Sequence, residues 1–172
     1  MLARHLEGDT GIPSSLVGYL DHLADLERFV FHGSNRRDIT ELGIERRSTD
    51  SRAFGRQQAV FATSDPHWAA YFALVDRSNV DRLRNGSISF SGRARTRWYQ
   101  RDVVVLDPNG PLLTEGRIYV LPRDTFHPEP KILGIVDTAQ WVSPMPVKPL
   151  FSLRITAERY PLARHIRVVG SR

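Results

Sequence analysis

The segment Phe29-Val30-Phe31-His32-Gly33-Ser34 decides how this chain is expected to fold. Its apolar run after Arg28 predicts a short buried strand. The run ends in a histidine, a glycine and a serine, and a glycine at a strand end leaves the main chain open to another group because it has no side chain. We therefore expect the domain to be built around this strand and the histidine at its end.

An amphipathic helix is expected before this strand, from Ile12 to Arg28. Pro13 and Ser14 suit its first turn. Leu16, Leu20, Leu23 and Glu27 follow helical spacing, and Leu26 lies alongside. The leucines form the apolar side of this helix. Residues 35–55 carry charge and glycine without a sustained period, which indicates a short helix near Ile39 to Leu42 and then a mobile loop.

A second buried strand is expected from Gln58 to Thr63, followed by a helix. The sequence Thr63-Ser64-Asp65-Pro66 is a strong helix start, because Asp65 can cap the helix and proline suits its first position. One side of that helix is expected to be apolar. Its members are Trp68, Tyr71, Phe72 and Val75.

Short strands are predicted for the rest of the chain, separated by turn signals such as Asp107-Pro108-Asn109-Gly110. They are Ser87 to Phe90, Asp102 to Leu106, Arg117 to Leu121, Lys131 to Val136, Leu150 to Ile155 and His165 to Val169. Helices early and strands late predict an α+β fold with a mainly antiparallel sheet. We expect a single domain over residues 1–172, with residues 1–28 as a helical segment packed on it.

Composition excludes several classes of protein. The chain has 172 residues, 41% apolar and 25% charged, which is typical of a globular protein. It has no cysteine, so disulfides, thiolate nucleophiles and cysteine-ligated zinc are excluded. No apolar run approaches the roughly 20 residues that cross a bilayer, and no secretory signal is evident. We expect a cytoplasmic protein without membrane contact, although an effector secreted by another route would have the same features.

The net charge of +5 favours anionic partners: nucleic acid, dinucleotide phosphates or acidic proteins. The alternative is a basic surface without a dedicated site, because arginine is also what high-GC genomes encode by default.

Four pieces of sequence follow one another in a characteristic order. They are Phe31-His32-Gly33-Ser34; then Leu42-Gly43-Ile44, Phe54-Gly55 and Val60-Phe61-Ala62; then Ala69-Ala70-Tyr71; and finally Ala139-Gln140-Trp141 with Val147-Lys148-Pro149-Leu150-Phe151. In order and spacing they resemble the ADP-ribosyltransferases of the PARP type. The resemblance implies the ADP-ribosyltransferase fold, with split antiparallel β-sheets and flanking helices. It also implies an enzyme that uses NAD as substrate, for mono-ADP-ribosyl transfer to a macromolecule or for NAD glycohydrolysis.

The resemblance also implies roles for individual residues. The main chain of Gly33 would pair with the nicotinamide carboxamide, to which Ser34 adds its hydroxyl. His32 would bind the neighbouring ribose, and Tyr71 would stack on the nicotinamide ring, which contributes about 1 kcal/mol beyond area burial. The other predicted NAD-binding residues are Val60, Phe61 and Ala62. Taken singly, His32 could be a satisfied buried histidine and Tyr71 a core residue.

Two positions depart from the family pattern. Val60 stands where the family often has a tyrosine, and Gln140 stands where it usually has a catalytic glutamate. A carboxylate stabilises the cationic sugar that forms as nicotinamide leaves, whereas an amide keeps only the hydrogen bond. At about 4 Å and an effective dielectric of about 20 this charge is worth roughly 4 kcal/mol, on the order of a thousandfold in rate. Glu129 and Asp137 are nearby acids that could take the role of Gln140.

The most basic stretch runs from Ser91 to Arg101. Its arginines could share one strand face as an anion-binding surface, with Trp98 and Tyr99 available for base stacking; a solvated edge strand is the alternative. The arginines concerned are Arg93, Arg95, Arg97 and Arg101. No metal site is expected. Neither His67 with Asp65 nor His127 with Glu129 has the spacing of four residues that brings two ligands together on a helix, and neither pair has a third ligand.

Three hypotheses remain open. The first is an enzyme that binds NAD between the strand 29–34 and the helix 66–75 and breaks the nicotinamide–ribose bond, with His32 and Gln140 as catalytic residues. The second is a non-catalytic NAD-binding or ADP-ribose-binding module, which Val60 and Gln140 would favour. The third is an RNA-modifying relative similar to the tRNA 2′-phosphotransferases. In that case the arginine-rich stretch would bind the phosphate of the RNA.

Overall fold

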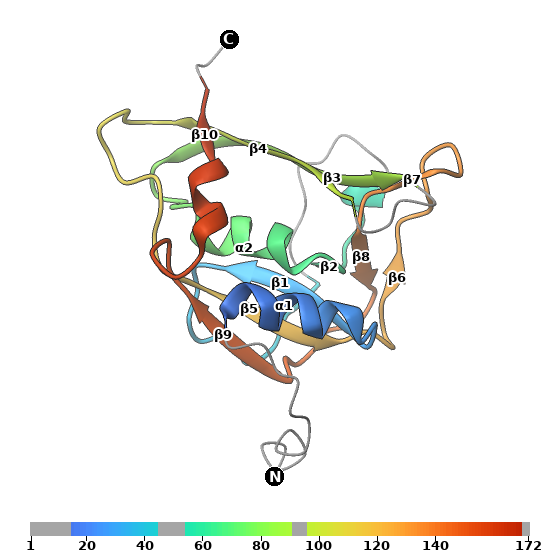
Figure 1. The fold of residues 1–172 in the computed structure, drawn as a ribbon. Helices are drawn as coiled ribbons and strands as arrows, with labels where there is room; N and C mark the ends of the chain where they lie inside the picture. The colour runs from blue at the N-terminus through green and yellow to red at the C-terminus, as the bar shows by residue number, and fades with distance from the viewer. Residues whose placement is uncertain (1–14, 45–53, 91–95, 170–172) are drawn as a thin grey trace.

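Two antiparallel sheets enclose a central helix in the computed structural model, which describes residues 15–44, 54–90 and 96–169 (Figure 1). The six-stranded first sheet has the order β6-β8-β2-β1-β5-β9, and the four-stranded second sheet has the order β10-β4-β3-β7. Every pairing between strands is antiparallel except that of β10 with β4. The predicted α+β class with mainly antiparallel strands is confirmed.

The described residues form two α-helices, two 3-10 helices and ten strands. The helices are α1 (Leu16–Asp25) and α2 (Pro66–Leu74), and the 3-10 helices are η2 (Phe54–Arg56) and η3 (Pro161–His165). The strands are β1 (Phe29–Ser34), β2 (Val60–Thr63), β3 (Val80–Phe90), β4 (Trp98–Val105), β5 (Gly116–Pro122), β6 (His127–Pro128), β7 (Val136–Asp137), β8 (Gln140–Ser143), β9 (Phe151–Ile155) and β10 (Arg167–Val168). No helix among these is long and apolar enough to cross a membrane.

Strand β1 is the centre of the first sheet. It pairs with β5 over its whole length, whereas its ladder with β2 holds only the pair Phe31↔Thr63. Val30 and Phe31 are fully buried and belong to two different core clusters, one on each face of the sheet. The buried strand predicted from this segment is confirmed, and the divergence of β2 from its end opens the first sheet there.

Helix α2 lies between the two sheets and is buried on nearly all sides. Asp65 caps it by accepting a hydrogen bond from the backbone N–H of His67 at 3.0 Å, and Pro66 begins it, as predicted. Gly33 lets the helix approach β1 closely: a Cβ at Gly33 would lie 1.8 Å from the carbonyl oxygen of Ala69. The strand end and the helix are therefore held in direct backbone contact.

Helix α1 is shorter than the sequence indicates. Ser15 caps it, with its hydroxyl 3.1 Å from the backbone N–H of Gly18. The helix ends at Asp25, and Glu27 takes a left-handed backbone conformation with φ +52° that no helix can continue. Leu20 and Leu23 pack in the cluster that α2 and β1 share. The predicted start at Ile12 lies outside the described residues.

Two expected elements are wrong. No helix forms near Ile39 to Leu42, because Leu42 bridges to Val147 through two backbone hydrogen bonds of 2.8 and 3.0 Å. Lys131 to Val136 forms a turn instead of a strand, since Leu133 and Gly134 both have positive φ. The mobile loop expected next to Gly55 falls largely on residues that lie outside the described part of the chain.

Candidate functional site

A cleft of about 870 Å³ lies where β2 diverges from β1, between the first sheet, helix α2 and the edge of β3. Residues from each of these elements line it. From the first sheet and α2 come Phe31, His32, Gly33, Phe61, Ala62, Thr63, Trp68, Ala69 and Phe72. The cleft thus contains four residues of the predicted NAD-binding set: His32, Gly33, Phe61 and Ala62.

His32 bridges the two diverging strands. Its Nδ1 lies 2.8 Å from the carbonyl oxygen of Phe61. A carbonyl oxygen can only accept, so Nδ1 carries the proton and donates it. In the neutral ring, Nε2 is therefore the acceptor nitrogen. The fold fixes the tautomer that can receive a hydrogen bond from a hydroxyl group.

Aromatic side chains of α2 form the wall of the cleft. Trp68 and Phe72 stand one helical turn apart, with ring centroids 5.8 Å apart. The indole N–H of Trp68 donates to the side chain of Asn85 on β3 at 3.3 Å. This bond ties α2 to the second sheet at the cleft.

Tyr71 is not part of this wall, so its position does not support the predicted stacking on a nicotinamide ring. Its side chain is only 1% exposed, and its hydroxyl donates to the carbonyl oxygen of Asp102 at 3.1 Å. Burial raises the pKa of the Tyr71 hydroxyl above its ordinary value. Because α2 is buried on nearly all sides, helical spacing could not show which of its aromatic residues face the cleft.

Two other predicted contacts are also placed elsewhere. Val60 is buried in the core cluster on the opposite face of the first sheet, with Leu42, Tyr119 and Phe126. Val60 does not line the cleft, so its position does not support the predicted role in binding NAD. The hydroxyl of Ser34 accepts from the backbone N–H of Arg36 at 3.1 Å, and Ser34 is not among the residues that line the cleft.

Gln140 begins β8, directly beside β2, where it pairs with Thr63. The residue before it, Ala139, has φ +56°, and its N–H donates to a side-chain oxygen of Asp137 at 2.7 Å. A left-handed conformation at a residue other than glycine costs about 1 to 3 kcal/mol and is concentrated at functional sites. His32, Thr63 and Gln140 therefore lie on three neighbouring strands, although Gln140 does not itself line the cleft.

The two nearby acids have different surroundings. Asp137 forms an ion pair with Arg97, with 3.0 Å between Oδ2 and Nη2. Glu129 lies across from Gln140, to whose carbonyl oxygen it donates its N–H at 2.7 Å. Its carboxylate accepts a 2.6 Å hydrogen bond from the hydroxyl of Thr138, which lines the cleft. Glu129 is thus the carboxylate that a cleft residue holds in place.

Arginines line the end of the cleft formed by β3 and the turn before it. They are Arg77, Arg82 and Arg84. A guanidinium group pairs well with phosphate oxygens because it offers a planar set of donors. Sequence reasoning missed these residues, although Leu83 between Arg82 and Arg84 gives the polar–apolar–polar order of a half-buried strand.

The basic stretch before Arg101 does not form the predicted arginine face. Arg97 is paired with Asp137, and Arg101 is buried with its guanidinium 3.9 Å from the ring centre of Tyr99. Arg93 and Arg95 lie outside the described residues. Arg97 and Arg101 therefore do not form a surface that could bind phosphate. A function similar to that of the RNA 2′-phosphotransferases was expected to need such a surface in this stretch.

His67 joins three elements. Its Nε2 lies 2.7 Å from Oδ1 of Asp21 on α1, and its Nδ1 lies 2.7 Å from the hydroxyl of Tyr160, next to η3. Within residues 15–44, 54–90 and 96–169, no group of three or more histidine or acidic side chains could hold a metal ion.

Comparisons with protein-family models, with curated proteins and with solved structures find no match to this chain. The resemblance to ADP-ribosyltransferases therefore rests on the residues of this chain and on where the fold places them.

Proposed function

We propose that the cleft binds NAD and that the protein breaks the bond between nicotinamide and ribose, passing ADP-ribose to a macromolecule or to water. One observation carries this proposal. The segments with His32, with Phe61 to Thr63 and with Gln140 are far apart in the sequence, yet they lie on the neighbouring strands β1, β2 and β8. The two separate, mainly antiparallel sheets around α2 support the proposal of an ADP-ribosyltransferase-like fold.

The cleft suits a dinucleotide in size and chemistry. Its volume of about 870 Å³ falls within the range of small-molecule pockets, which is roughly 300 to 1,000 Å³. Trp68 and Phe72 offer aromatic surface to a planar ring. Arg82 and Arg84, on the other side of the cleft, offer guanidinium groups to a diphosphate. NAD combines these two chemical groups in one molecule.

The reaction needs little from the protein beyond binding and electrostatics. When the bond between ribose C1′ and the nicotinamide nitrogen breaks, the electron pair leaves with nicotinamide, and the sugar becomes cationic. Nε2 of His32 can accept a hydrogen bond from a ribose hydroxyl and orient the sugar. The carboxylate of Glu129, held by Thr138, supplies negative charge beside the cleft. Water or a macromolecular nucleophile then bonds to C1′ and loses a proton.

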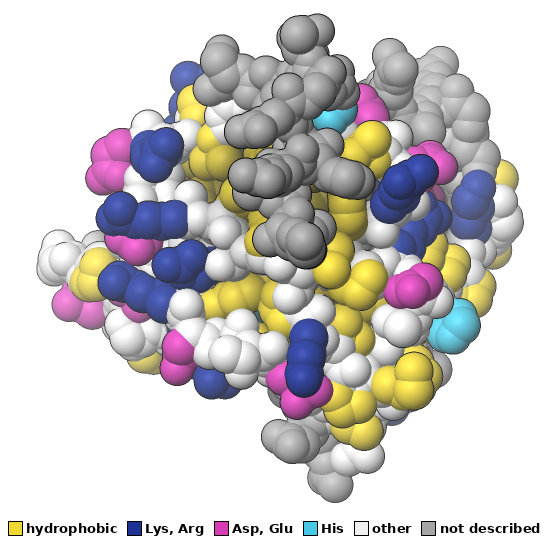
Figure 2. Space-filling model, turned by 90° about the horizontal axis from the view of Figure 1, so that it is seen from below, with side chains coloured by type: hydrophobic (Ala, Val, Ile, Leu, Met, Phe, Trp, Pro, Cys, Tyr) yellow, Lys and Arg dark blue, Asp and Glu magenta, His cyan; other side chains and the backbone are white. Residues whose placement is uncertain are grey.

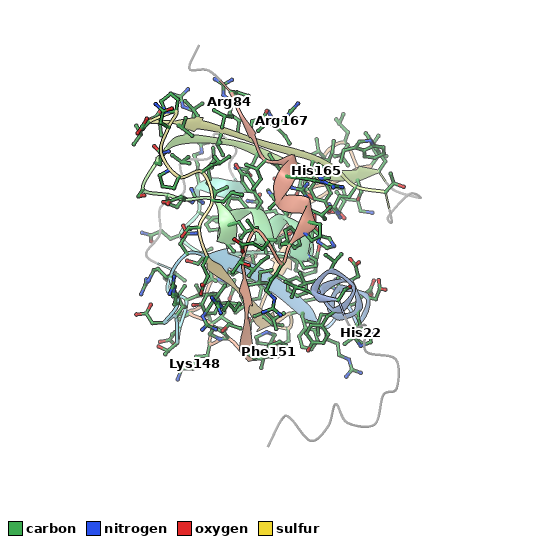
Figure 3. All side chains as sticks on the ribbon, turned by 60° about the vertical axis from the view of Figure 1, so that its left-hand side comes forward. His22, Arg84, Lys148, Phe151, His165 and Arg167 are labelled. Atoms are coloured by element: carbon green, nitrogen blue, oxygen red, sulfur yellow. The ribbon has the colours of Figure 1, made fainter. Side chains whose placement is uncertain are left out.

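The test is the release of nicotinamide from NAD by the purified protein, measured by chromatography with and without a cell extract as source of acceptors. His32→Ala should abolish the release. His165→Ala is the matched control, because His165 is exposed on η3, outside the cleft (Figure 3). If concentrated protein releases no nicotinamide with any extract, the proposed activity is wrong.

A second candidate is a non-catalytic module that binds NAD or ADP-ribose. It is favoured by Gln140, an amide at the position where turnover needs a carboxylate, and by the burial of Val60 in the core. Titration calorimetry separates the two: binding without nicotinamide release selects the module, and no binding to either compound rejects both candidates.

A further inference from the structure

The second sheet has one face toward α2 and one face that no helix covers in the described part of the chain (Figure 1). Alternate residues of β3 and β4 point to this uncovered side, which we call the outer face. On β3 they are Arg82, Arg84, Gly86, Ile88 and Phe90, and on β4 they are Trp98, Gln100, Asp102 and Val104, of which Asp102 and Val104 are buried. The inner side chains between them, such as Ser87 and Ser89, are buried. The outer face is a continuous surface built by two strands.

One end of the outer face is aromatic. Trp98 is 45% exposed and Phe90 is 40% exposed, and their rings meet edge to face with centroids 5.4 Å apart. Ile88, directly across from Trp98, is 36% exposed. Single apolar side chains are common on protein surfaces, but a group of large ones in contact with each other is typical of a binding site.

The other end is basic. Arg84 and Arg167 lie on either side of Asp102 in the strand register, and both point outward from the sheet (Figure 3). Arg167 pairs with Asp102 at 2.8 Å while its side chain remains 70% exposed. With Arg82, three arginines share this end with one aspartate on the outer face. The side of the molecule seen in Figure 2 instead mixes basic and acidic side chains.

The centre of the face, between these ends, is open at Gly86. Gly86 pairs with Gln100 there, and a Cβ at Gly86 would meet no atom within 4 Å. Arg84 and Ile88 are four residues apart on one strand, which corresponds to about 13 Å. An extended chain can therefore touch the arginines and the aromatic end at the same time.

We propose that the outer face of the second sheet binds single-stranded nucleic acid, with phosphates at Arg82, Arg84 and Arg167 and bases stacked on Trp98 and Phe90. Exposed aromatic rings beside arginines are the combination that single strands require, because unpaired bases can stack while the backbone meets positive charge. A duplex keeps its bases stacked internally and cannot use the aromatic end. Five outer-face residues also line the cleft, so a bound strand would reach its mouth; they are Arg82, Arg84, Gly86, Ile88 and Gln100.

This binding needs no turnover of NAD and is tested without NAD, although it uses Arg82 and Arg84, which are also proposed to bind the diphosphate of NAD. Fluorescence anisotropy with a labelled 12-nucleotide single strand and with the matching duplex, each at two salt concentrations, measures it directly. We expect the single strand to bind more tightly than the duplex and its affinity to fall as salt rises. No binding of the single strand at low salt, or equal binding of the duplex, would overturn the proposal.

Variants separate the two ends of the face. Trp98→Ala should weaken binding of the single strand by at least tenfold. Arg84→Gln should weaken it and reduce its dependence on salt, whereas Lys148→Gln, which removes a charge from the distant end of the molecule, should have no effect (Figure 3).

Gly86→Glu removes no side chain and places a carboxylate in open space at the centre of the face, so it tests the surface without disturbing the core. It should weaken binding at least tenfold relative to Gly86→Gln, which has the same shape without the charge. Equal affinities of these two variants would overturn the proposed location.

Discussion

Nδ1 of His32 lies 2.8 Å from the carbonyl oxygen of Phe61, next to the pair Phe31↔Thr63 at which the ladder between β1 and β2 ends. The imidazole thus links the two strands where they diverge. His32 and Phe61, the two residues that it links, both line the cleft. One side chain has a structural contact through Nδ1, and its Nε2 is the nitrogen that the proposed NAD binding would use. Substitutions at this position should therefore change both binding and stability.

His32→Ala should lower affinity for NAD by at least tenfold and destabilise the protein by about 1 kcal/mol, the usual net value of one hydrogen bond. His32→Asn, whose amide can still donate a hydrogen bond, should recover stability better than activity. Calorimetry with NAD and urea denaturation measure the two effects. Unchanged NAD affinity in a folded His32→Ala protein would place the ligand elsewhere.

Gly33 and Gly86 lie in strands of different sheets and should respond to alanine in opposite ways. A Cβ at Gly33 would lie 1.8 Å from the carbonyl oxygen of Ala69, so Gly33→Ala must push α2 away from β1. We expect a loss of at least about 1 to 3 kcal/mol, the usual range for overpacking. Gly86→Ala meets nothing within 4 Å and should be neutral or stabilising by up to about 1 kcal/mol. Urea denaturation compares the two variants, and similar stabilities would contradict the packing described here.

Sequence reasoning succeeded where the signals are local. The apolar run before His32 and the pair Asp65-Pro66 determine β1 and the start of α2 through backbone physics within a few residues. It failed where the structure of a segment depends on pairing with residues far away in the sequence. Strand β8 is only four residues long and is defined by its pairing with β2, and no short segment of sequence reveals that pairing.

The site was predicted in part for the same reason. His32, Gly33, Phe61 and Ala62 were predicted from the resemblance to ADP-ribosyltransferases, and all four line the cleft. Which face of α2 meets the cleft depends on the two sheets that pack against the helix. Helical spacing alone therefore could not show that Phe72 lines the cleft and that its neighbour Tyr71 is buried.

The buried tyrosines predict how stability depends on alkaline pH. Burial raises the pKa of Tyr71, Tyr99 and Tyr160 above the ordinary value of 10.0. A group whose pKa is higher in the folded state gives stability that is fully present below the unfolded pKa and is lost as pH rises above it. The free energy of unfolding should therefore fall steeply above about pH 10.

Tyr71→Phe tests this prediction, because it leaves the ring in the core and removes the ionisable hydroxyl. The variant should lose about 1 kcal/mol at neutral pH, with the hydrogen bond to Asp102, and should show a shallower decline above about pH 10. Urea denaturation at a series of pH values gives both quantities. An alkaline decline as steep as that of the original protein would contradict the assigned cause.

Gln140→Glu tests the chemistry proposed for the cleft most directly. A carboxylate at this position would stabilise the cationic sugar with little change in side-chain volume, so the rate of nicotinamide release should rise, by at most roughly a thousandfold, while affinity for NAD changes less. Glu129 lies directly across from this position, and two carboxylates facing each other repel, which should keep the gain well below that ceiling. The double variant Gln140→Glu with Glu129→Gln removes the repulsion and should release nicotinamide faster than Gln140→Glu alone.

Glu129→Gln by itself should slow the release of nicotinamide by the original protein, because it removes the carboxylate that Thr138 holds beside the cleft. If Gln140→Glu leaves the rate unchanged while Glu129→Gln abolishes it, the acid that supports the reaction is Glu129, and the position of Gln140 has no electrostatic role.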